Sequence, residues 1–170
     1  MGPLLAHFLT WTCYGTWTRG RAPGWIDGKG ERAFGAPVEE PDQTLARRDM
    51  SNLAEPPFLM DGPLRRVALD AIVALVGDKG WHLRAAHVRG NHVHVVVSGM
   101  ADPARGMAAF KARITRDLRA AGVHRERYWT RHGSTRHIFD PAKLDEVLDY
   151  VIRRQGVPMA WTDGAEAHYG

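Results

Sequence analysis

Two histidines one residue apart, His92 and His94, begin a valine-rich run in the stretch RGNHVHVVVSG, residues 89–99. Alternate side chains of a β-strand share a face, so both imidazoles would lie on one side, about 7 Å apart along the chain. Neutral imidazole is a good ligand for divalent metals, but two ligands are too few for a tight structural zinc site. This pattern has two interpretations. The two histidines form half of a labile metal site that another element completes, or they are exposed strand histidines without a function.

A tyrosine near the end of the chain could supply the reaction. Tyr150 lies about 120° from the centre of an apolar stripe at helical spacing. A phenol can attack phosphorus and form a phosphotyrosine, but it is protonated at neutral pH. A cation held by the histidines would favour the phenolate and neutralise phosphate charge. An amphipathic edge residue is the alternative reading. The stripe consists of Leu144, Val147, Leu148, Val151 and Ile152.

Positive charge is concentrated in one part of the chain. The net charge is +4, and residues 101–140 carry nine Lys and Arg against four Asp and Glu. Residues 1–60 and 141–170 are slightly acidic. A basic band near the histidines suggests a polyanionic partner, and a solvated helix face is the alternative.

The composition is that of a globular protein. A chain of 170 residues with 44% hydrophobic and 25% charged residues suits a single domain over 1–170. Cys13 is the only cysteine, which excludes an intrachain disulfide, and we expect it to be a small buried residue. We find no membrane-spanning run and no signal peptide. The expected location is the cytoplasm, in association with the nucleoid.

Hydrophobic periodicity and turn residues predict the elements that position these side chains. The expected order is a strand over 6–12, an irregular excursion over 19–61 with a short helix near 43–53, a helix over 61–80, a hairpin of strands over 81–88 and 92–98, a helix over 102–122, a basic aromatic loop over 123–134, a strand over 135–140, a helix over 141–156, and a tail from about 157 with no clear element. This βαββαβ order predicts an α+β fold, a ferredoxin-like antiparallel sheet with two packed helices, plus a C-terminal helix that carries Tyr150.

Four stretches in this order resemble a known family. NHVHVVV is similar to the His-hydrophobe-His signature of HUH endonucleases. Together with HFLTWTCYGTW, YWTRHGSTRHIFD and LDEVLDYVIRRQG, it resembles the single-strand transposases of small bacterial insertion sequences, in particular the REP-associated tyrosine transposases. The resemblance covers most of residues 6–156 and leaves out the excursion.

The resemblance implies a domain that binds single-stranded or hairpin DNA and acts as a monomer or homodimer. It implies cleavage and strand transfer through a 5′-phosphotyrosine with release of a free 3′-hydroxyl. Tyr150 matches the nucleophile, and His92 and His94 match the ligands of Mg²⁺ or Mn²⁺. Ligand softness alone would leave zinc or nickel open.

The chain departs from the family pattern at the third metal ligand. Relatives often place Asn or Gln about one turn after the tyrosine, where this chain has Arg154 followed by Gln155. On a regular helix Gln155 would point about 140° away from Tyr150. It reaches the site only if the helix frays before Gly156, and on that condition we take it as the third ligand.

Loop aromatics and arginines are the candidate DNA contacts. Aromatic rings can stack on unpaired bases, and arginines can contact phosphates; ordinary packing and solvated charges are the alternatives. The aromatic candidates are Tyr14, Trp17 and Trp25, and the arginine candidates are Arg113, Arg116, Arg127, Arg131 and Arg136.

Two other functions fit the same residues. One is a domesticated, non-catalytic DNA-hairpin-binding protein of the same fold. The other is a metal-dependent phosphodiesterase that acts on small nucleotides with water as the nucleophile, and that would tolerate the loss of the Tyr150 hydroxyl.

Overall fold

The computed structural model describes residues 2–18, 40–156 and 159–162. Its centre is a five-stranded antiparallel sheet with the strand order β4-β1-β3-β2-β5. The strands are β1 (Ala6–Thr12), β2 (His82–Val88), β3 (His92–Ser98), β4 (Ser134–Ile138) and β5 (Ala160–Thr162). The helices of the described part are α1 (Gln43–Ser51), α2 (Gly62–Lys79), α3 (Pro103–Ala120) and α4 (Pro141–Arg153). The prediction of an α+β fold built on an antiparallel sheet is confirmed.

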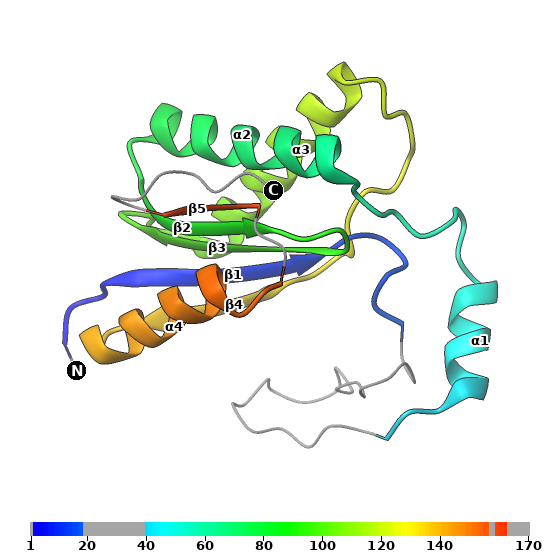
Figure 1. Ribbon diagram of the computed structural model, residues 1–170, viewed down its shortest axis with the longest axis horizontal. Coiled ribbons are helices and arrows are strands. Elements are labelled where there is room, and N and C mark those ends of the chain that lie inside the picture. The colour runs from blue at the N-terminus through cyan, green and yellow to red at the C-terminus, as the bar shows by residue number, and fades with distance from the viewer. Residues whose placement is uncertain (1, 19–39, 157–158, 163–170) are drawn as a thin grey trace.

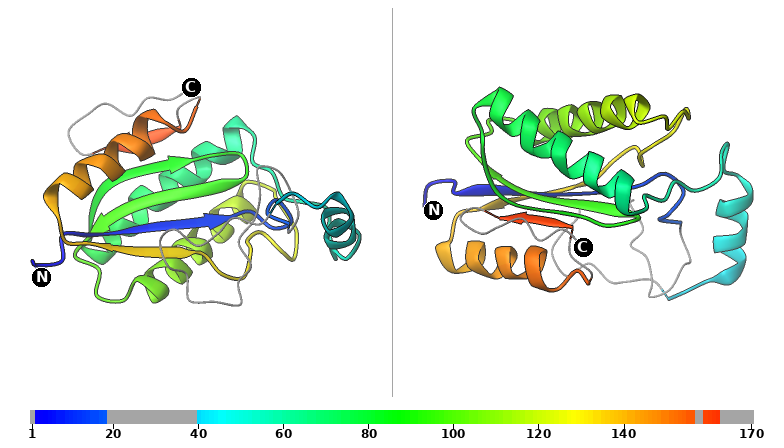
Figure 2. Two further views of the ribbon diagram at one scale, coloured as in Figure 1. Left: turned by 90° about the horizontal axis from the view of Figure 1, so that it is seen from below. Right: turned by 45° about the horizontal axis from the view of Figure 1, so that its top comes forward.

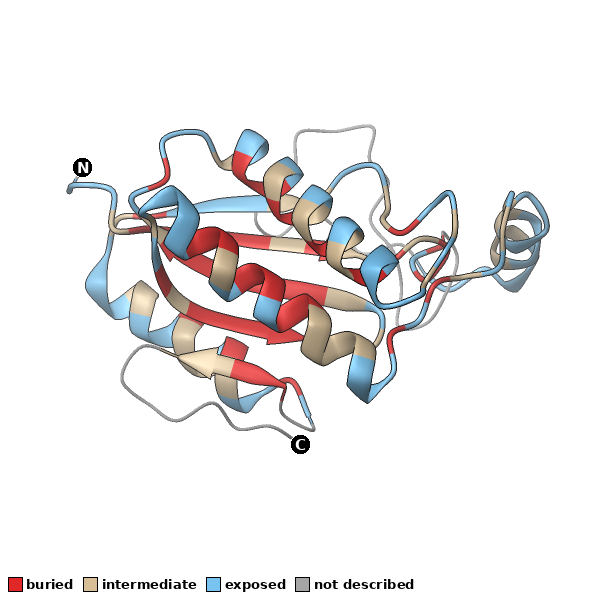
Figure 3. Ribbon diagram, turned by 90° about the horizontal axis from the view of Figure 1, so that it is seen from above, coloured by how far each residue is buried: buried red, intermediate tan, exposed pale blue. Residues whose placement is uncertain are grey.

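Helices cover both faces of the sheet. Helices α2 and α3 lie side by side on one face, and α4 lies on the other (Figures 1 and 2). Seen from above, the buried residues of α2 and α3 lie over the buried middle of the strands (Figure 3). The face of the sheet opposite α2 and α3 is therefore covered by α4.

Strand alternation divides the core into two clusters. Val93, Val95 and Val97 of β3 pack in the larger cluster with α2 and α3, whereas Val96 packs in a smaller cluster with Val151 of α4. The predicted apolar stripe of α4 is confirmed, since all five of its residues lie in or against the smaller cluster. His92 and His94, which alternate with the valines of the larger cluster, consequently belong to the α4 face.

Each of the three long helices begins at an aspartate. The Asp61 carboxylate accepts a hydrogen bond from Leu64 N at 3.0 Å, and Asp102 and Asp140 cap α3 and α4 in the same way. A proline follows in the first turn of each helix, where its missing N–H has no helical partner to lose. These caps set where α4, and with it Tyr150, enters the fold.

Several elements differ from the sequence prediction. β5 is a strand in the tail, where the sequence predicted no element. Its three residues form a strand by pairing with Ala85, Ala86 and His87 of β2. β4 begins at Ser134 and ends at Ile138, since Asp140 is already the cap of α4. α4 ends at Arg153 and not at 156.

The excursion is described only from residue 40. Helix α1 has no buried residue and lies away from the sheet (Figure 1). Phe58 and Met60, which follow it, are buried in the larger core cluster. The prediction of one domain over 1–170 stays a prediction.

Two expectations from composition can be compared with the structure. Cys13 is fully buried as expected, and burial raises the pKa of its thiol to about 12. None of the helices in the described ranges has the length and apolar character needed to cross a membrane.

Candidate active site

The two imidazoles of β3 lie together beneath the end of α4. The ring centroids of His92 and His94 are 4.7 Å apart. His94 is buried, and its Nδ1 is 2.8 Å from the hydroxyl of Thr10, its cross-strand partner on β1. The Nε2 atom of His94 is buried and has no hydrogen-bond partner among the described residues.

His92 is oriented by its neighbour in the chain. Its Nδ1 is 2.7 Å from Asn91 Oδ1, and because that oxygen only accepts hydrogen bonds, Nδ1 carries the proton. The lone pair of the neutral ring is then on Nε2, which is 3.5 Å from Gln155 Oε1. Two acceptor atoms therefore face each other, an arrangement that a cation between them would stabilise.

Gln155 reaches the histidines because α4 ends before it. Arg154 is the C-cap, and Gly156 adopts φ +78°, a left-handed conformation that glycine adopts readily. The Gln155 amide donates from Nε2 to Tyr150 O at 3.5 Å, which directs Oε1 toward His92. Arg154, one turn after the tyrosine, instead bonds Asp149 at 2.9 Å.

Burial keeps both imidazoles neutral. It lowers the pKa of His94 to about 3, with a further lowering by the nearby His92 and an opposite effect of the Gln155 amide. Burial also lowers the pKa of His92, and the positive charge of Arg89 adds to that effect. Neutral rings at neutral pH have the lone pairs that metal binding requires.

Tyr150 lies beside the histidines of its own chain. Its ring centroid is 5.7 Å from that of His94 and 6.4 Å from that of Phe8. The side chain is 42% exposed, as expected for a residue at the flank of the apolar stripe. The phenol is therefore open to a ligand on one side and close to the imidazoles on the other.

His87 holds this end of α4 on the sheet. The last carbonyls of a helix have no partner within the helix, and His87 Nδ1 donates to one of them, Val151 O, at 2.8 Å. Gln155 bonds the carbonyl of Tyr150. Two side chains thus fix the turn of helix that carries the phenol.

The donor set fits a divalent cation. Two imidazole nitrogens and one amide oxygen converge, and the buried Nε2 of His94 lacks a partner in the described part of the chain. No group of three or more His, Cys, Asp or Glu able to hold a metal occurs in the described ranges. Three neutral ligands leave positions for water and substrate oxygens, which suits a labile catalytic ion better than a structural one.

Four of the predicted DNA contacts line one cavity of about 580 Å³. They are Tyr14, Trp17, Arg127 and Arg131. The Arg127 guanidinium lies 5.7 Å from the centroid of the Tyr14 ring, and Trp17 is 58% exposed. Thr130, which also lines the cavity, has its hydroxyl 2.7 Å from that of Thr12. Thr12 pairs with His92 across the strands, so the cavity adjoins the histidine end of the sheet.

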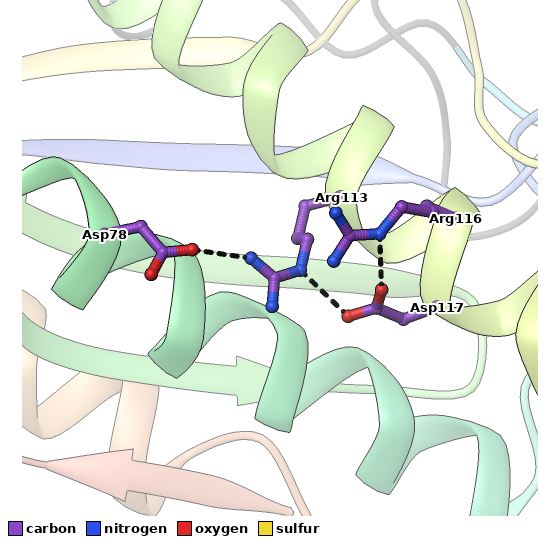
Figure 4. A network of polar contacts seen from close by, with 4 residues as sticks. All are labelled: Asp78, Arg113, Arg116 and Asp117. Atoms are coloured by element: carbon purple, nitrogen blue, oxygen red, sulfur yellow. Dashed lines mark hydrogen bonds and ion pairs between the residues drawn. The ribbon is translucent and has the colours of Figure 1, made fainter.

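Two of the predicted arginines are engaged elsewhere. Arg113 bonds Asp78 and Asp117 at 2.8 and 2.9 Å, and Arg116 bonds Asp117 at 2.9 Å (Figure 4). Both lie on α3, which covers the opposite face of the sheet from the histidines. The structure does not bring them to the site.

The remaining candidates divide between the site face and the undescribed part. Arg136 pairs with Phe8 across β4 and β1, so it shares the sheet face of His94 and is exposed there. Trp25 lies outside the described residues.

Sequence reasoning missed three residues that orient the site: Thr10, His87 and Asn91. The alternation of HFLTWT puts Thr10 on the polar side of β1, which was a usable signal. His87 gave no local signal, because its partner is a helix carbonyl 64 positions away.

Comparisons with known proteins yield a structural likeness only. No family model matches the chain, and no curated protein matches it. The chain is similar to a solved structure described as the REP associates tyrosine transposase bound to a REP hairpin, with 14% sequence identity and a TM-score of 0.48. The match covers 91% of this chain and 67% of that chain. At this identity, function has to be inferred from this chain's own side chains.

Proposed function

We propose that this chain binds single-stranded or hairpin DNA and cleaves and rejoins it through a covalent 5′-phosphotyrosine at Tyr150. His92, His94 and Gln155 hold Mg²⁺ or Mn²⁺ in this proposal. The fold is of the ferredoxin-like type, with β5 added at one edge and α4 laid across the second face. The enzyme is a transposase-like single-strand endonuclease of the HUH type.

One observation carries the proposal. The Tyr150 ring is 5.7 Å from His94, while His92 Nε2 and Gln155 Oε1 face each other at 3.5 Å. The exposed Tyr150 thus lies beside buried side chains that could hold a metal, which supports the roles proposed for them. A phosphodiesterase that used water would not need a phenol there.

The cleavage step is a displacement at phosphorus. The Tyr150 oxygen forms a bond to the phosphorus of a phosphodiester, and the bond to the 3′-oxygen breaks. That oxygen takes up a proton and leaves as a free 3′-hydroxyl, while the phenol proton passes to solvent. Attack by a 3′-hydroxyl on the phosphotyrosine reverses the step and joins two strands without an external energy source.

The metal ion and the residues that position its ligands have separate roles. A divalent ion bound there would neutralise charge on the non-bridging phosphate oxygens and favour the phenolate. Thr10 and Asn91 hold the imidazoles in orientation. His87 and Gln155 keep the Tyr150 turn of α4 at a fixed distance from them.

The cavity beside the histidine end is suited to unpaired bases. Tyr14 and Trp17 supply ring faces for stacking, and Arg127 and Arg131 supply charge for the backbone. Arg136 extends the basic surface on the site face. A strand that crosses Thr12 could therefore reach both the cavity and the histidines.

Covalent capture tests this function. The probe is a pool of 3′-labelled hairpin oligonucleotides with randomised single-stranded flanks, incubated with Mn²⁺ and run on a denaturing protein gel. The native chain should form a labelled, protease-sensitive adduct that EDTA abolishes. The Tyr150→Phe chain should form no adduct and still bind the hairpin. Tyr169→Phe, which removes another phenol hydroxyl of the chain, is the matched control.

The outcomes separate the candidate functions. An adduct that persists in Tyr150→Phe contradicts the assigned nucleophile. Binding without any adduct selects the non-catalytic hairpin-binding protein. Metal-dependent cleavage that tolerates Tyr150→Phe selects a phosphodiesterase.

A further inference from the structure

Arg89 is a cation at the site that has no part in the ligand set. It follows β2 in the hairpin loop, and its backbone N–H donates to His92 O at 2.8 Å. Its guanidinium lies against the turn that ends α4, because a Cβ built on Gly156 would be 2.9 Å from Arg89 Nη1. The guanidinium therefore lies between the loop that precedes His92 and the residue that follows Gln155.

The position of Arg89 puts it next to the ligand set. Its backbone N–H bonds the carbonyl of His92, and its guanidinium lies against Gly156, the residue after Gln155. A cation held between these two points is close to any anion bound near His92 and Gln155. Arg89 is therefore a neighbour of the ligands without being a ligand.

Among the described residues no carboxylate pairs with Arg89, in contrast to three other arginines of the chain. Arg66, Arg113 and Arg154 each bond an aspartate within 3.0 Å. Within residues 2–18, 40–156 and 159–162, Arg89 is half-buried and forms no ion pair. A partly desolvated charge is costly unless an anion accompanies it, and the facing groups of the site are imidazoles and an amide.

We propose that Arg89 binds a phosphate of the DNA strand within one nucleotide of the phosphodiester that Tyr150 attacks. The proposal rests on the function proposed above. The planar guanidinium donates two N–H groups to the two non-bridging oxygens of one phosphate. The missing side chain at Gly156 leaves the space that this group occupies.

Neutral-phosphate scanning tests the contact. Each oligonucleotide of a series carries one methylphosphonate at a different position around the cleavage site. Binding is measured with Tyr150→Phe chains, so that cleavage does not interfere. Arg89→Gln should weaken binding to the all-phosphate strand by roughly ten- to a hundredfold. It should also reduce the slope of log affinity against log salt concentration by about 0.7, the value for one single-strand phosphate.

The decisive result is non-additivity at one position. At the phosphate that Arg89 contacts, the methylphosphonate and Arg89→Gln together should weaken binding no more than either alone. Arg89→Lys should recover part of the affinity, because it keeps the charge and loses the paired donors. Arg105→Gln, which removes a charge with a side chain 90% exposed on α3, should show additive effects at every position.

The two proposals fail in different ways. Additive effects of Arg89→Gln at all positions would falsify the phosphate contact, even if the native chain forms the adduct. Non-additivity at one position without any adduct from the native chain would support the contact and overturn the phosphotyrosine. Thermal unfolding of each variant verifies that the substitutions leave the fold intact.

Discussion

The chemistry of single residues at this site depends on which atoms are left without a hydrogen bond. His94 and His92 each use Nδ1 for a neighbour, Thr10 or Asn91, and keep Nε2 directed at the space near Gln155. Strand alternation in the sequence was sufficient to predict that the two imidazoles share a face. It could not identify Thr10 as the partner of His94, because the residues are 84 positions apart and meet only through strand pairing.

Thr10→Val should lower metal affinity by roughly ten- to a hundredfold, the usual effect of removing a hydrogen bond that orients a ligand. Valine keeps the shape of threonine and removes only the hydroxyl that is 2.8 Å from His94 Nδ1. Calorimetric titration with Mn²⁺ measures the change. Thr12→Val is the control, since the Thr12 hydroxyl bonds Thr130 and no imidazole. Equal affinities of the native chain and Thr10→Val would contradict the orienting role.

His7 should make the fold sensitive to acid. It is buried with Nε2 2.9 Å from Met100 O, and burial, reinforced by His137, lowers its pKa. Because the folded pKa lies below the unfolded value of about 6.5, the contribution of neutral His7 is complete above that pH. It is lost as the pH falls toward the folded pKa, at up to about 1.4 kcal/mol per pH unit.

Denaturant unfolding between pH 7 and pH 5 measures this effect. His7→Gln keeps a donor for Met100 O but cannot take up a proton, so its unfolding free energy should depend less steeply on pH than that of the native chain. His132→Gln, at an exposed loop position, is the matched control substitution. If the unfolding free energy of His7→Gln depends on pH as steeply as that of the native chain, another group causes the acid sensitivity.

At the scale of elements, the end of α4 decides whether the third ligand is in place. The sequence predicted a helix over 141–156, in which Gln155 points away from Tyr150. The helix stops at Arg153, and a left-handed Gly156 turns the chain so that Gln155 meets His92. Helical periodicity located the apolar stripe and the position of Tyr150 on its flank. It could not predict the end, which depends on side-chain bonds from His87 and Gln155 to the last carbonyls.

Gly156→Ala should impair both stability and cleavage. The left-handed conformation costs a residue with a side chain about 1–2 kcal/mol, and the new Cβ would crowd Arg89 Nη1 at 2.9 Å. Gly80→Ala is the matched control, because Gly80 is also left-handed and has nothing within 4 Å of its Cβ position. Both variants should lose about 1 kcal/mol or more in chemical denaturation, and only Gly156→Ala should form less adduct. Equal adduct yields from the two variants would contradict the role of this turn.

At the scale of the whole molecule, Tyr150, His92, His94 and Gln155 of one chain lie together. The sequence could not decide whether Tyr150 serves the histidines of its own chain or those of a second copy. The ring of Tyr150 lies 5.7 Å from His94 of the same chain. The fold class followed from the order of elements, whereas β5 did not, because its three residues have no pattern of their own and depend on the edge of β2.

Mixing two inactive variants tests the use of a single chain. Tyr150→Phe keeps the histidines, and His94→Ala keeps the phenol. If Tyr150 works on its own chain, the mixture should form no covalent adduct with hairpin DNA. The adduct is measured on the denaturing gel described above. Native chain diluted into each variant is the control, because it shows that an adduct can be detected in a mixture. An adduct from the mixture would mean that α4 is exchanged between copies.

Helix α4 is tied to the sheet at both of its ends. At its start, β4 leads into the cap at Asp140, and at its finish the chain returns within a few residues to pair as β5 with the edge of β2. A DNA end attached to Tyr150 would therefore stay in one position relative to the sheet between cleavage and rejoining. Such a tether would favour ligation to whichever 3′-hydroxyl arrives, over escape of the broken strand.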